Sequence, residues 1–213
     1  MATDISGIAA LEEPVRRALY EYVAGLESPV SRDQAASALG ITRSLAAFHL
    51  DRLVSEDLLT VQFRRLSGRS GPGAGRPSKL YSRAERQLVV TLPPRSYALA
   101  ARLLADAVER GVDVNQVARE YGRRRGCETP ASRSGEDEIE TQLRSHGYQP
   151  RRSPNGFELR NCPFHALAQE HPRLICCMNL AMLQGLLEGM GADCSEAVML
   201  QKPDRCCVAI TKL

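Results

Sequence analysis

Residues 42–59 read TRSLAAFHLDRLVSEDLL, and this stretch decides the fold of the N-terminal part of the chain. Thr42 is a predicted N-cap, because its hydroxyl can accept hydrogen bonds from the free backbone N–H groups of a helix start. The apolar residues that follow recur with the three- and four-residue spacing of an amphipathic helix. The stripe expected to pack this helix on its neighbour consists of Leu45, Phe48, Leu50, Leu53 and Val54.

The preceding segment, residues 31–40 (SRDQAASALG), predicts a shorter helix. Ser31 and Gln34 have the spacing of a capping box, and Gly40 is a typical stop signal. Two helices joined by a short glycine-containing turn form a helix-turn-helix, whose second helix can read base edges in the major groove. The residues of that helix that we expect to contact DNA are Thr42, Arg43, Ser44, Ala47 and His49.

A basic segment follows this helix. Alternating Leu59, Val61 and Phe63 predict a half-buried strand, and Leu80 with Tyr81 predicts a returning strand after a tip rich in Gly, Pro and Ser. Residues 59–83 contain six basic residues and no acidic one, which is typical of a hairpin that binds DNA phosphates or a narrow minor groove. The side chains expected to contact DNA here are Arg64, Arg65, Arg69, Arg76 and Lys79. The alternative is that helices and hairpin form only a scaffold for protein contacts.

The rest of the chain predicts two further regions and an α+β fold overall. Residues 97–108 have helical apolar spacing and predict a helix that packs on its own domain or on a second copy. Residues 129–135 are small and polar and predict a linker. We therefore expect a DNA-binding domain at 1–90, a helical dimerisation or linker region at 91–128, and an α+β cysteine-rich domain at 135–213.

Six of the seven cysteines lie between Cys162 and Cys207. Helical spacing predicts that Cys176 points inward and Cys177 towards solvent. We expect the chain to end in two strands, at residues 197–201 and 206–211, joined by a turn at residues 202–204. Strand parity favours Cys206 as the inward thiol of its pair. Cys162 falls at a corner between a strand and a helix, which completes a candidate trio. The gaps within this trio are not zinc-finger spacings, so the site would have to be assembled by the fold.

Thiolates are the usual ligands of iron–sulfur clusters and also bind zinc or copper. We expect Cys162, Cys176 and Cys206 to be metal ligands. A fourth ligand is open among Cys194, Cys207, Cys177 and His165. The alternatives are a redox switch between thiols, and cysteines that serve only as small buried side chains.

The stretch TRSLAAFHLDRLVSEDLL, followed by GRPSKLYS, resembles the bacterial winged-helix repressors of the broad ArsR type, and in particular the subgroup of the SufR iron–sulfur regulators. The stretch NCPF and the later cysteines are also similar to that subgroup. The resemblance implies a winged helix-turn-helix, a homodimer on a two-fold DNA operator, a [4Fe-4S] cluster and a repressor active with its cluster bound.

Other function classes have less support in the sequence. No basic N-terminal stretch precedes an apolar run, and no apolar segment is long enough to span a membrane, so we expect a cytoplasmic protein without a membrane partner. No CxxC motif and no Cys–His–Asp order indicates a thiol enzyme, so we expect no enzyme. A regulator that binds a small molecule in an apolar pocket along residues 172–189 is a further alternative.

Overall fold

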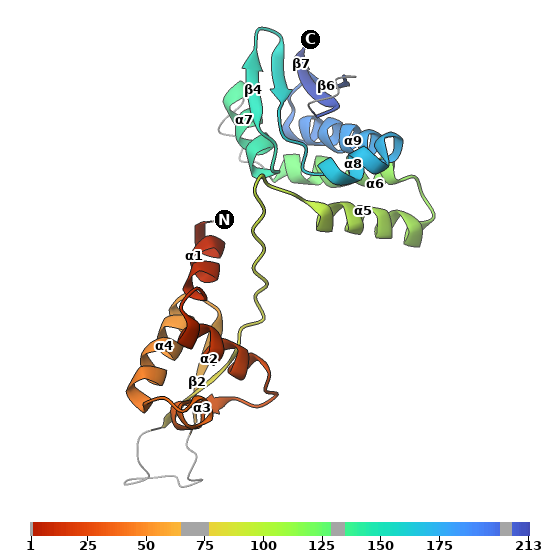
Figure 1. The fold of residues 1–213 in the computed structure, drawn as a ribbon. Helices are drawn as coiled ribbons and strands as arrows, with labels where there is room; N and C mark the ends of the chain where they lie inside the picture. Colours follow the sequence, from red (N-terminus) through yellow and green to blue (C-terminus); the bar gives the residue numbers. More distant parts are fainter. Residues whose placement is uncertain (1, 65–76, 129–134, 201–205) are drawn as a thin grey trace. The chain divides into compact units, whose positions relative to one another are not determined.

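The computed structural model describes residues 2–64, 77–128, 135–200 and 206–213. The chain divides into two compact units, Met1–Val90 and Thr91–Leu213 (Figure 1). Each unit combines helices with one small antiparallel sheet among its described residues, which confirms the α+β class. No helix in the described ranges is both long and apolar enough to cross a membrane.

The first unit packs helices around a three-stranded sheet of order β1-β3-β2. Its core includes the fully buried side chains of Leu19, Leu50, Leu53 and Tyr81. Its elements are α1 (Ala2–Ala10), α2 (Pro14–Ala24), β1 (Val30–Ser31), α3 (Arg32–Leu39), α4 (Arg43–Ser55), β2 (Leu59–Arg64) and β3 (Ser78–Arg83).

Both predicted ends of α3 and the predicted start of α4 are confirmed, whereas α4 ends at Ser55, before the predicted residue 59. Ser31 and Gln34 form a complete capping box, and Gly40 ends α3 in the left-handed conformation with φ of 65°. The Thr42 hydroxyl accepts a hydrogen bond from the Leu45 N–H at 3.3 Å. These short-range bonds set where α4 begins.

The predicted apolar stripe of α4 is wrong for two residues. The Phe48 side chain is 65% exposed and Leu45 is 38% exposed. The buried face instead carries Ala46, His49, Leu50 and Leu53. Burial of His49 is possible because Arg16 Nε of α2 donates a hydrogen bond to its Nδ1 at 3.4 Å. The buried face of α4 thus includes a polar residue, and Phe48 lies outside that face.

The second unit contains the cysteine segment and also the helices of residues 97–127 that we expected to form a separate region. One cluster of buried side chains runs from Ala100 in the first of these helices to Ile210 in the last strand. The four-stranded sheet has the order β4-β5-β7-β6. The elements are α5 (Tyr97–Arg110), α6 (Val114–Cys127), α7 (Glu136–Ser145), β4 (Pro150–Ser153), β5 (Gly156–Leu159), α8 (His165–Glu170), α9 (Pro172–Met190), β6 (Ser195–Met199) and β7 (Val208–Lys212).

The two final strands differ from their predicted bounds. We expected strands at residues 197–201 and 206–211, whereas β6 ends at Met199 and β7 begins only at Val208. Cys206 and Cys207 therefore precede β7 instead of lying within it. The turn predicted at residues 202–204 lies outside the described residues.

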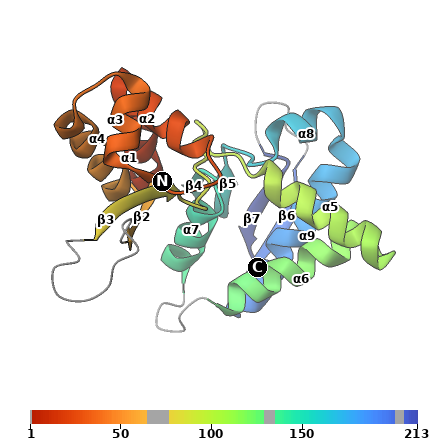
Figure 2. The ribbon, with the colours of Figure 1, turned by 90° about the horizontal axis from the view of Figure 1, so that it is seen from below.

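Helices α6 and α9 lie side by side with their backbones in contact (Figure 2). Gly122 and Gly126 of α6 face Gly185 and Gly189 of α9. A Cβ on any of the four would lie within 2.3 Å of a backbone oxygen of the other helix. Only glycine permits this approach, and α9 is the helix that carries Cys176.

Candidate functional site

Four cysteine thiols come together in the second unit. Cys162 lies in the loop between β5 and α8, Cys176 near the start of α9, and Cys206 and Cys207 directly before β7. The thiol of Cys162 interacts with that of Cys206, Cys206 with Cys207, and Cys207 with Cys176, and these interactions contribute to the pKa shifts of Cys162, Cys176 and Cys206. We call these four residues the thiol cluster. The structure thus brings the predicted trio together and adds Cys207.

The thiols of the cluster are shielded from solvent to different degrees. Cys162 and Cys206 are buried, whereas Cys176 and Cys207 are half-buried. The hydrogen bond to Cys206, together with burial, raises the pKa of the Cys162 thiol far above its ordinary value. Burial also raises the pKa of Cys176. The bond from Cys162 lowers the pKa of Cys206, but the bond to Cys207 and burial outweigh it and raise that pKa to about 11.

These pKa shifts define what the cluster can do chemically. At neutral pH the thiols of Cys162 and Cys206 are protonated, and protonated thiols are weak nucleophiles. A bound cation would reverse this state, because metal binding displaces protons from thiols. At neutral pH these two thiols are therefore poor nucleophiles, and a cation that bound to them would have to displace their protons.

Among the residues that the structure describes, the thiol cluster offers sulfur donors but no site for a single metal ion. Within the described ranges, no three or more His, Cys, Asp or Glu side chains are arranged around the position of a single metal ion. Four sulfur donors drawn from separate segments nevertheless fit the chemistry of an iron–sulfur cluster, which takes cysteine thiolates as its protein ligands. The thiols are gathered, but they are not arranged around one ion.

The other candidates for the fourth ligand lie elsewhere. Cys177 is exposed, as predicted from its helical position, and His165 is exposed at the start of α8. Cys194 precedes Ser195, which pairs with Lys212, whereas Cys207 precedes Val208, which pairs with Met199. Cys194 and Cys207 therefore lie at opposite ends of the ladder between β6 and β7. Cys207 is the candidate that the fold places with the trio.

The loop that carries Cys162 is tied to residues 94–96, directly before α5. Arg95 Nη1 donates hydrogen bonds to the Asn161 side-chain oxygen at 2.5 Å and to the Cys162 carbonyl oxygen at 2.9 Å. The Ser96 N–H donates to the Pro163 carbonyl at 2.9 Å. Asn161 is buried and donates back to the Pro94 carbonyl at 3.0 Å. Sequence reasoning missed these contacts, although Asn161 directly precedes the Cys-Pro pair.

The predicted DNA-contacting residues of α4 differ in exposure. Thr42, Arg43 and Ser44 are exposed at its start, and Ala47 is half-buried. The prediction for His49 is wrong, because its side chain is only 8% exposed and lies against α2. Sequence reasoning placed Phe48 in the core, whereas it is exposed on this helix.

The strands after α4 are anchored to it by Asp51. Its carboxylate accepts hydrogen bonds from the Tyr81 hydroxyl at 2.7 Å, from Lys79 Nζ at 2.9 Å and from Arg32 Nη2 at 2.5 Å. Burial alone would raise the pKa of Asp51, but these hydrogen bonds hold it below its ordinary value. The network fixes β3 and the start of α3 against α4.

The predicted basic contacts of the hairpin are only partly described. Lys79 is ion-paired with Asp51, and Arg64 is exposed at the end of β2, opposite Ser78. Arg65, Arg69 and Arg76 lie outside the described residues, as does most of the predicted tip.

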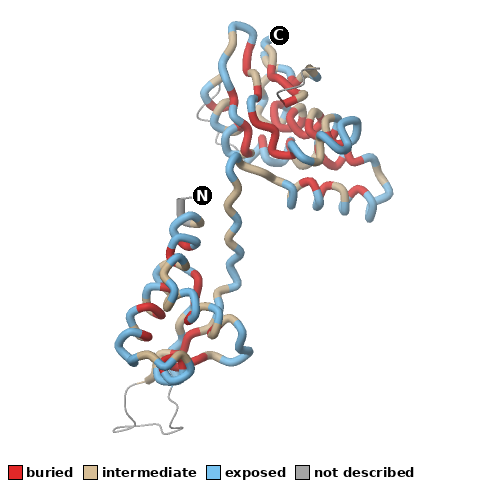
Figure 3. Tube along the Cα trace, in the orientation of Figure 1, coloured by how far each residue is buried: buried red, intermediate tan, exposed pale blue. Residues whose placement is uncertain are grey.

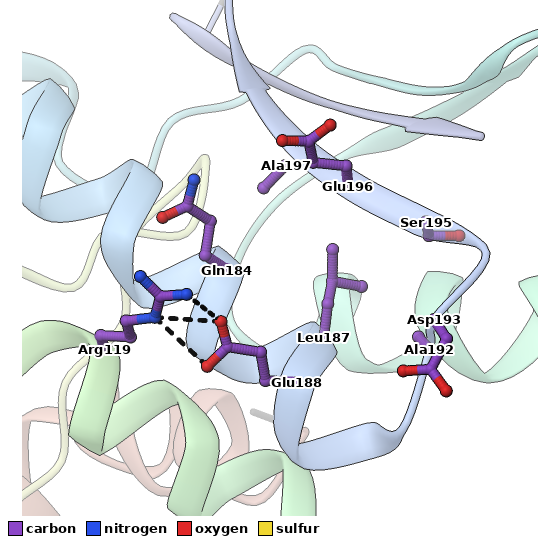
Figure 4. A pocket seen from close by; sticks show the side chains of 9 residues that line it. All are labelled: Arg119, Gln184, Leu187, Glu188, Ala192, Asp193, Ser195, Glu196 and Ala197. Carbon is purple, nitrogen blue, oxygen red and sulfur yellow. Dashed lines mark hydrogen bonds and ion pairs between the residues drawn. The ribbon is translucent and has the colours of Figure 1, made fainter. Parts of the chain in front are cut away.

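A shallow pocket lies beside the C-terminal half of α9 (Figure 4). Within it Arg119 Nε donates hydrogen bonds to both carboxylate oxygens of Glu188, at 3.0 and 3.2 Å. Its lining is mixed in polarity and contains no cysteine: Arg119, Gln184, Leu187, Glu188, Ala192, Asp193, Ser195, Glu196 and Ala197. It is thus separate from the thiol cluster and differs from the apolar pocket that one alternative required.

Comparison with known proteins adds no relative to this description. No protein-family model, no curated protein and no solved structure matches the chain.

Proposed function

We propose that this protein is a transcriptional regulator whose first unit is a winged helix that binds duplex DNA and whose thiol cluster holds an iron–sulfur cluster. The observation that carries the proposal is that the fold brings the thiols of Cys162, Cys206, Cys207 and Cys176 close enough to interact. These thiols come from three separate segments, so the fold has to bring them together.

The first unit supports the DNA-binding part of the proposal. Only Gly40, Ile41 and Thr42 separate α3 from α4, and the antiparallel strands β2 and β3 follow α4. The start of α4 exposes short polar side chains and Arg43, which is ion-paired with Asp33 at 2.6 Å. Side chains of these types suit base edges and phosphates. The acid-free segment of residues 59–83 adds positive charge from the neighbouring hairpin.

The protein groups that would hold the cofactor are the thiolates of Cys162, Cys176, Cys206 and Cys207. An iron–sulfur cluster supplies a group whose oxidation state or integrity responds to iron supply, oxidants or nitric oxide. The protein shields two of its ligands from solvent and holds the loop of Cys162 through Arg95. Zinc or copper is the alternative occupant, since both bind thiolates.

Two sets of contacts would carry a signal from the thiol cluster towards the DNA-binding unit. Arg95 and Ser96 join the Cys162 loop to the chain between α5 and the first unit. Helix α9, which carries Cys176, is fixed on α6 by the four glycines. We propose that occupancy of the thiol cluster orders these contacts and favours the form that represses at its operator.

A homodimer is part of the same proposal. Buried and exposed positions alternate along α5 (Figure 3). Ala100, Leu103 and Ala107 face the core, while the exposed face still carries apolar Tyr97, Ala101 and Val108, the last 82% exposed. A second copy covering this face would give the two-fold symmetry of a palindromic operator.

The test is an ultraviolet–visible spectrum of the full chain purified without oxygen, with iron, sulfide and zinc assayed in the same sample. We expect a broad brown absorbance with matched iron and sulfide, and a change in affinity for the DNA upstream of its own gene when the cluster is removed. A colourless protein that takes up no iron after reconstitution would overturn the cluster part. If the protein binds every DNA sequence equally weakly, with and without the cluster, the regulatory part of the proposal is wrong.

A second candidate function is thiol-redox sensing, which the direct interaction between the Cys162 and Cys206 thiols favours. Hydrogen peroxide would take two electrons and two protons from this pair, giving a disulfide and two molecules of water. Mass spectrometry of metal-free protein treated with peroxide would detect a peptide pair linked through these two residues. Its formation together with a change in DNA affinity, in protein that binds no iron, would favour this candidate.

A further inference from the structure

A buried chain of polar side chains leads to Cys206 from the interior of the second unit. The Tyr148 hydroxyl donates a hydrogen bond to Asn179 Oδ1, and Asn179 Nδ2 donates one to Cys206 Sγ at 3.4 Å. Asn179 is 0% exposed and Tyr148 is 2% exposed. The three residues come from the chain before β4, from α9 and from the chain before β7.

Packing alone does not account for an asparagine at this position. The neighbouring buried positions of α9 are apolar, among them Ile175, Met178 and Leu183. A fully buried amide is costly unless both its oxygen and its nitrogen have partners. Here the partners are Tyr148 and Cys206, so the amide is held between a hydroxyl and a sulfur.

The position of Asn179 relative to Cys176 indicates that the thiol cluster is the reason for an asparagine at this buried position. The two residues are three positions apart on α9, so they share a face of the helix. That face therefore supplies one sulfur and one N–H donor to the same place. A sulfur bound to a metal carries no proton and can only accept hydrogen bonds, which matches the N–H that Asn179 directs at it.

We infer that Asn179 is a positioning residue of the metal site, which stabilises negative charge on the Cys206 sulfur through its amide N–H, and that Tyr148 holds the amide in this orientation. This inference rests on the proposed iron–sulfur function. Hydrogen bonds to the sulfurs are among the factors that set a cluster's reduction potential. Because the reduced cluster carries more negative charge, the bond favours reduction and raises the potential.

The experiment compares cluster potentials in the reconstituted full chain, measured by redox titration and followed by visible absorbance. Asn179→Leu removes both hydrogen bonds at similar volume. Asn179→Asp keeps an acceptor for Tyr148 but loses the N–H, and Tyr148→Phe removes only the hydroxyl. Met182→Leu is the matched control, because Met182 is 2% exposed on the same helix and has an apolar side chain.

We expect Asn179→Leu and Asn179→Asp to make reduction less favourable by about tenfold, which is about 59 mV for a one-electron couple. Tyr148→Phe should shift the potential in the same direction by less, and Met182→Leu should leave it unchanged. Tyr148→Phe and Asn179→Asp also keep the question answerable if Asn179→Leu does not fold.

The outcomes separate this inference from the proposed function. If the wild-type protein loads and all variants keep its potential, the role of Asn179 is wrong while the proposed function stands. An equal shift in Met182→Leu would also overturn it, since loosened packing would then explain the effect. If the wild-type protein takes up neither iron nor sulfide, the proposed function and this inference fail together.

Discussion

Gly122 of α6 lies so close to Met182 of α9 that an added Cβ would be 2.0 Å from the Met182 carbonyl oxygen. Gly185 stands in the same relation to the Arg119 carbonyl oxygen, at 2.1 Å, so the approach is reciprocal. The obstacle in both cases is backbone, which no side-chain rotation can move. The position of α9, and with it that of Cys176 and Asn179, therefore depends on these glycines.

This relationship predicts a large cost for Gly122→Ala. The added methyl group must push α6 away from α9, so we expect a loss of about 3 kcal/mol in the free energy of unfolding, at the upper end of overpacking effects. Arg123→Ala, at an exposed position of the same helix, should change it by about 0.5 kcal/mol or less. Urea unfolding followed by circular dichroism measures both. Equal stability of the two variants would show that the helices can separate without cost.

Local signals in the sequence were enough to predict both ends of α3 and the start of α4. Ser31, Gly40 and Thr42 act through hydrogen bonds or backbone angles within a few residues of themselves, so their chemistry is visible in the sequence. His49 shows the opposite case. Its burial depends on Arg16, which lies 33 residues earlier, and no pattern in α4 reveals that partner.

The thiol cluster was predictable only in part, because only some of its members are positioned by residues near them in sequence. Helical spacing separated Cys176 from Cys177, because the orientation of neighbours on a helix follows from its period. Strand parity could not place Cys207, because β7 begins only after it and the two thiols do not alternate as strand residues do. The role of Asn179 could not be predicted, because its partners, Tyr148 and Cys206, lie far away in sequence.

The contact between Arg95 and the Cys162 carbonyl predicts that Arg95→Ala weakens the coupling between cluster occupancy and DNA affinity. We expect the variant to take up iron and sulfide as wild type does, since no ligand is changed. The difference in DNA affinity between the loaded and the metal-free protein should shrink about threefold, because two of the four hydrogen bonds between the Cys162 loop and residues 94–96 are lost. Fluorescence anisotropy with labelled operator DNA measures both states. Arg102→Ala, at an exposed position of α5, is the control, and an equal effect there would point to charge alone.

The Asp51 network predicts a pH dependence of stability in the first unit. The pKa of Asp51 is lower in the folded than in the unfolded protein, where it is about 4. Its contribution is therefore fully present above pH 4 and is lost as pH falls through the lower folded value. Thermal unfolding can be followed between about pH 2 and 6, a range that spans the titration of Asp51. The unfolding temperature should fall as the pH is lowered, and it should fall less in Asp51→Asn. Parallel curves for the two proteins would mean that Asp51 is not the group that titrates.

Because Phe48 is exposed, we expect its substitution to weaken DNA binding while hardly changing the stability of the fold. Its side chain is 65% exposed, so Phe48→Ala should cost less than about 1 kcal/mol in the free energy of unfolding, whereas Leu50→Ala should cost about 2–5 kcal/mol. An aromatic ring on the exposed face of α4 can contact a thymine methyl group in the major groove. We therefore expect Phe48→Ala to weaken operator binding about tenfold while unfolding stays close to wild type. Operator affinity equal to wild type would remove this face of α4 from the DNA interface.

Cys176 and Cys177 form a matched pair for testing the thiol cluster, because they are adjacent in sequence and differ in orientation. The Cys176 thiol is half-buried and interacts with that of Cys207, whereas Cys177 is exposed. Cys176→Ser should abolish the brown absorbance and reduce bound iron and sulfide to background, since a hydroxyl is a poor replacement for a soft thiolate ligand. Cys177→Ser should load as wild type does. Iron and sulfide assays on both variants decide the matter, and loss of loading in both would show that the cluster uses the exposed face of α9.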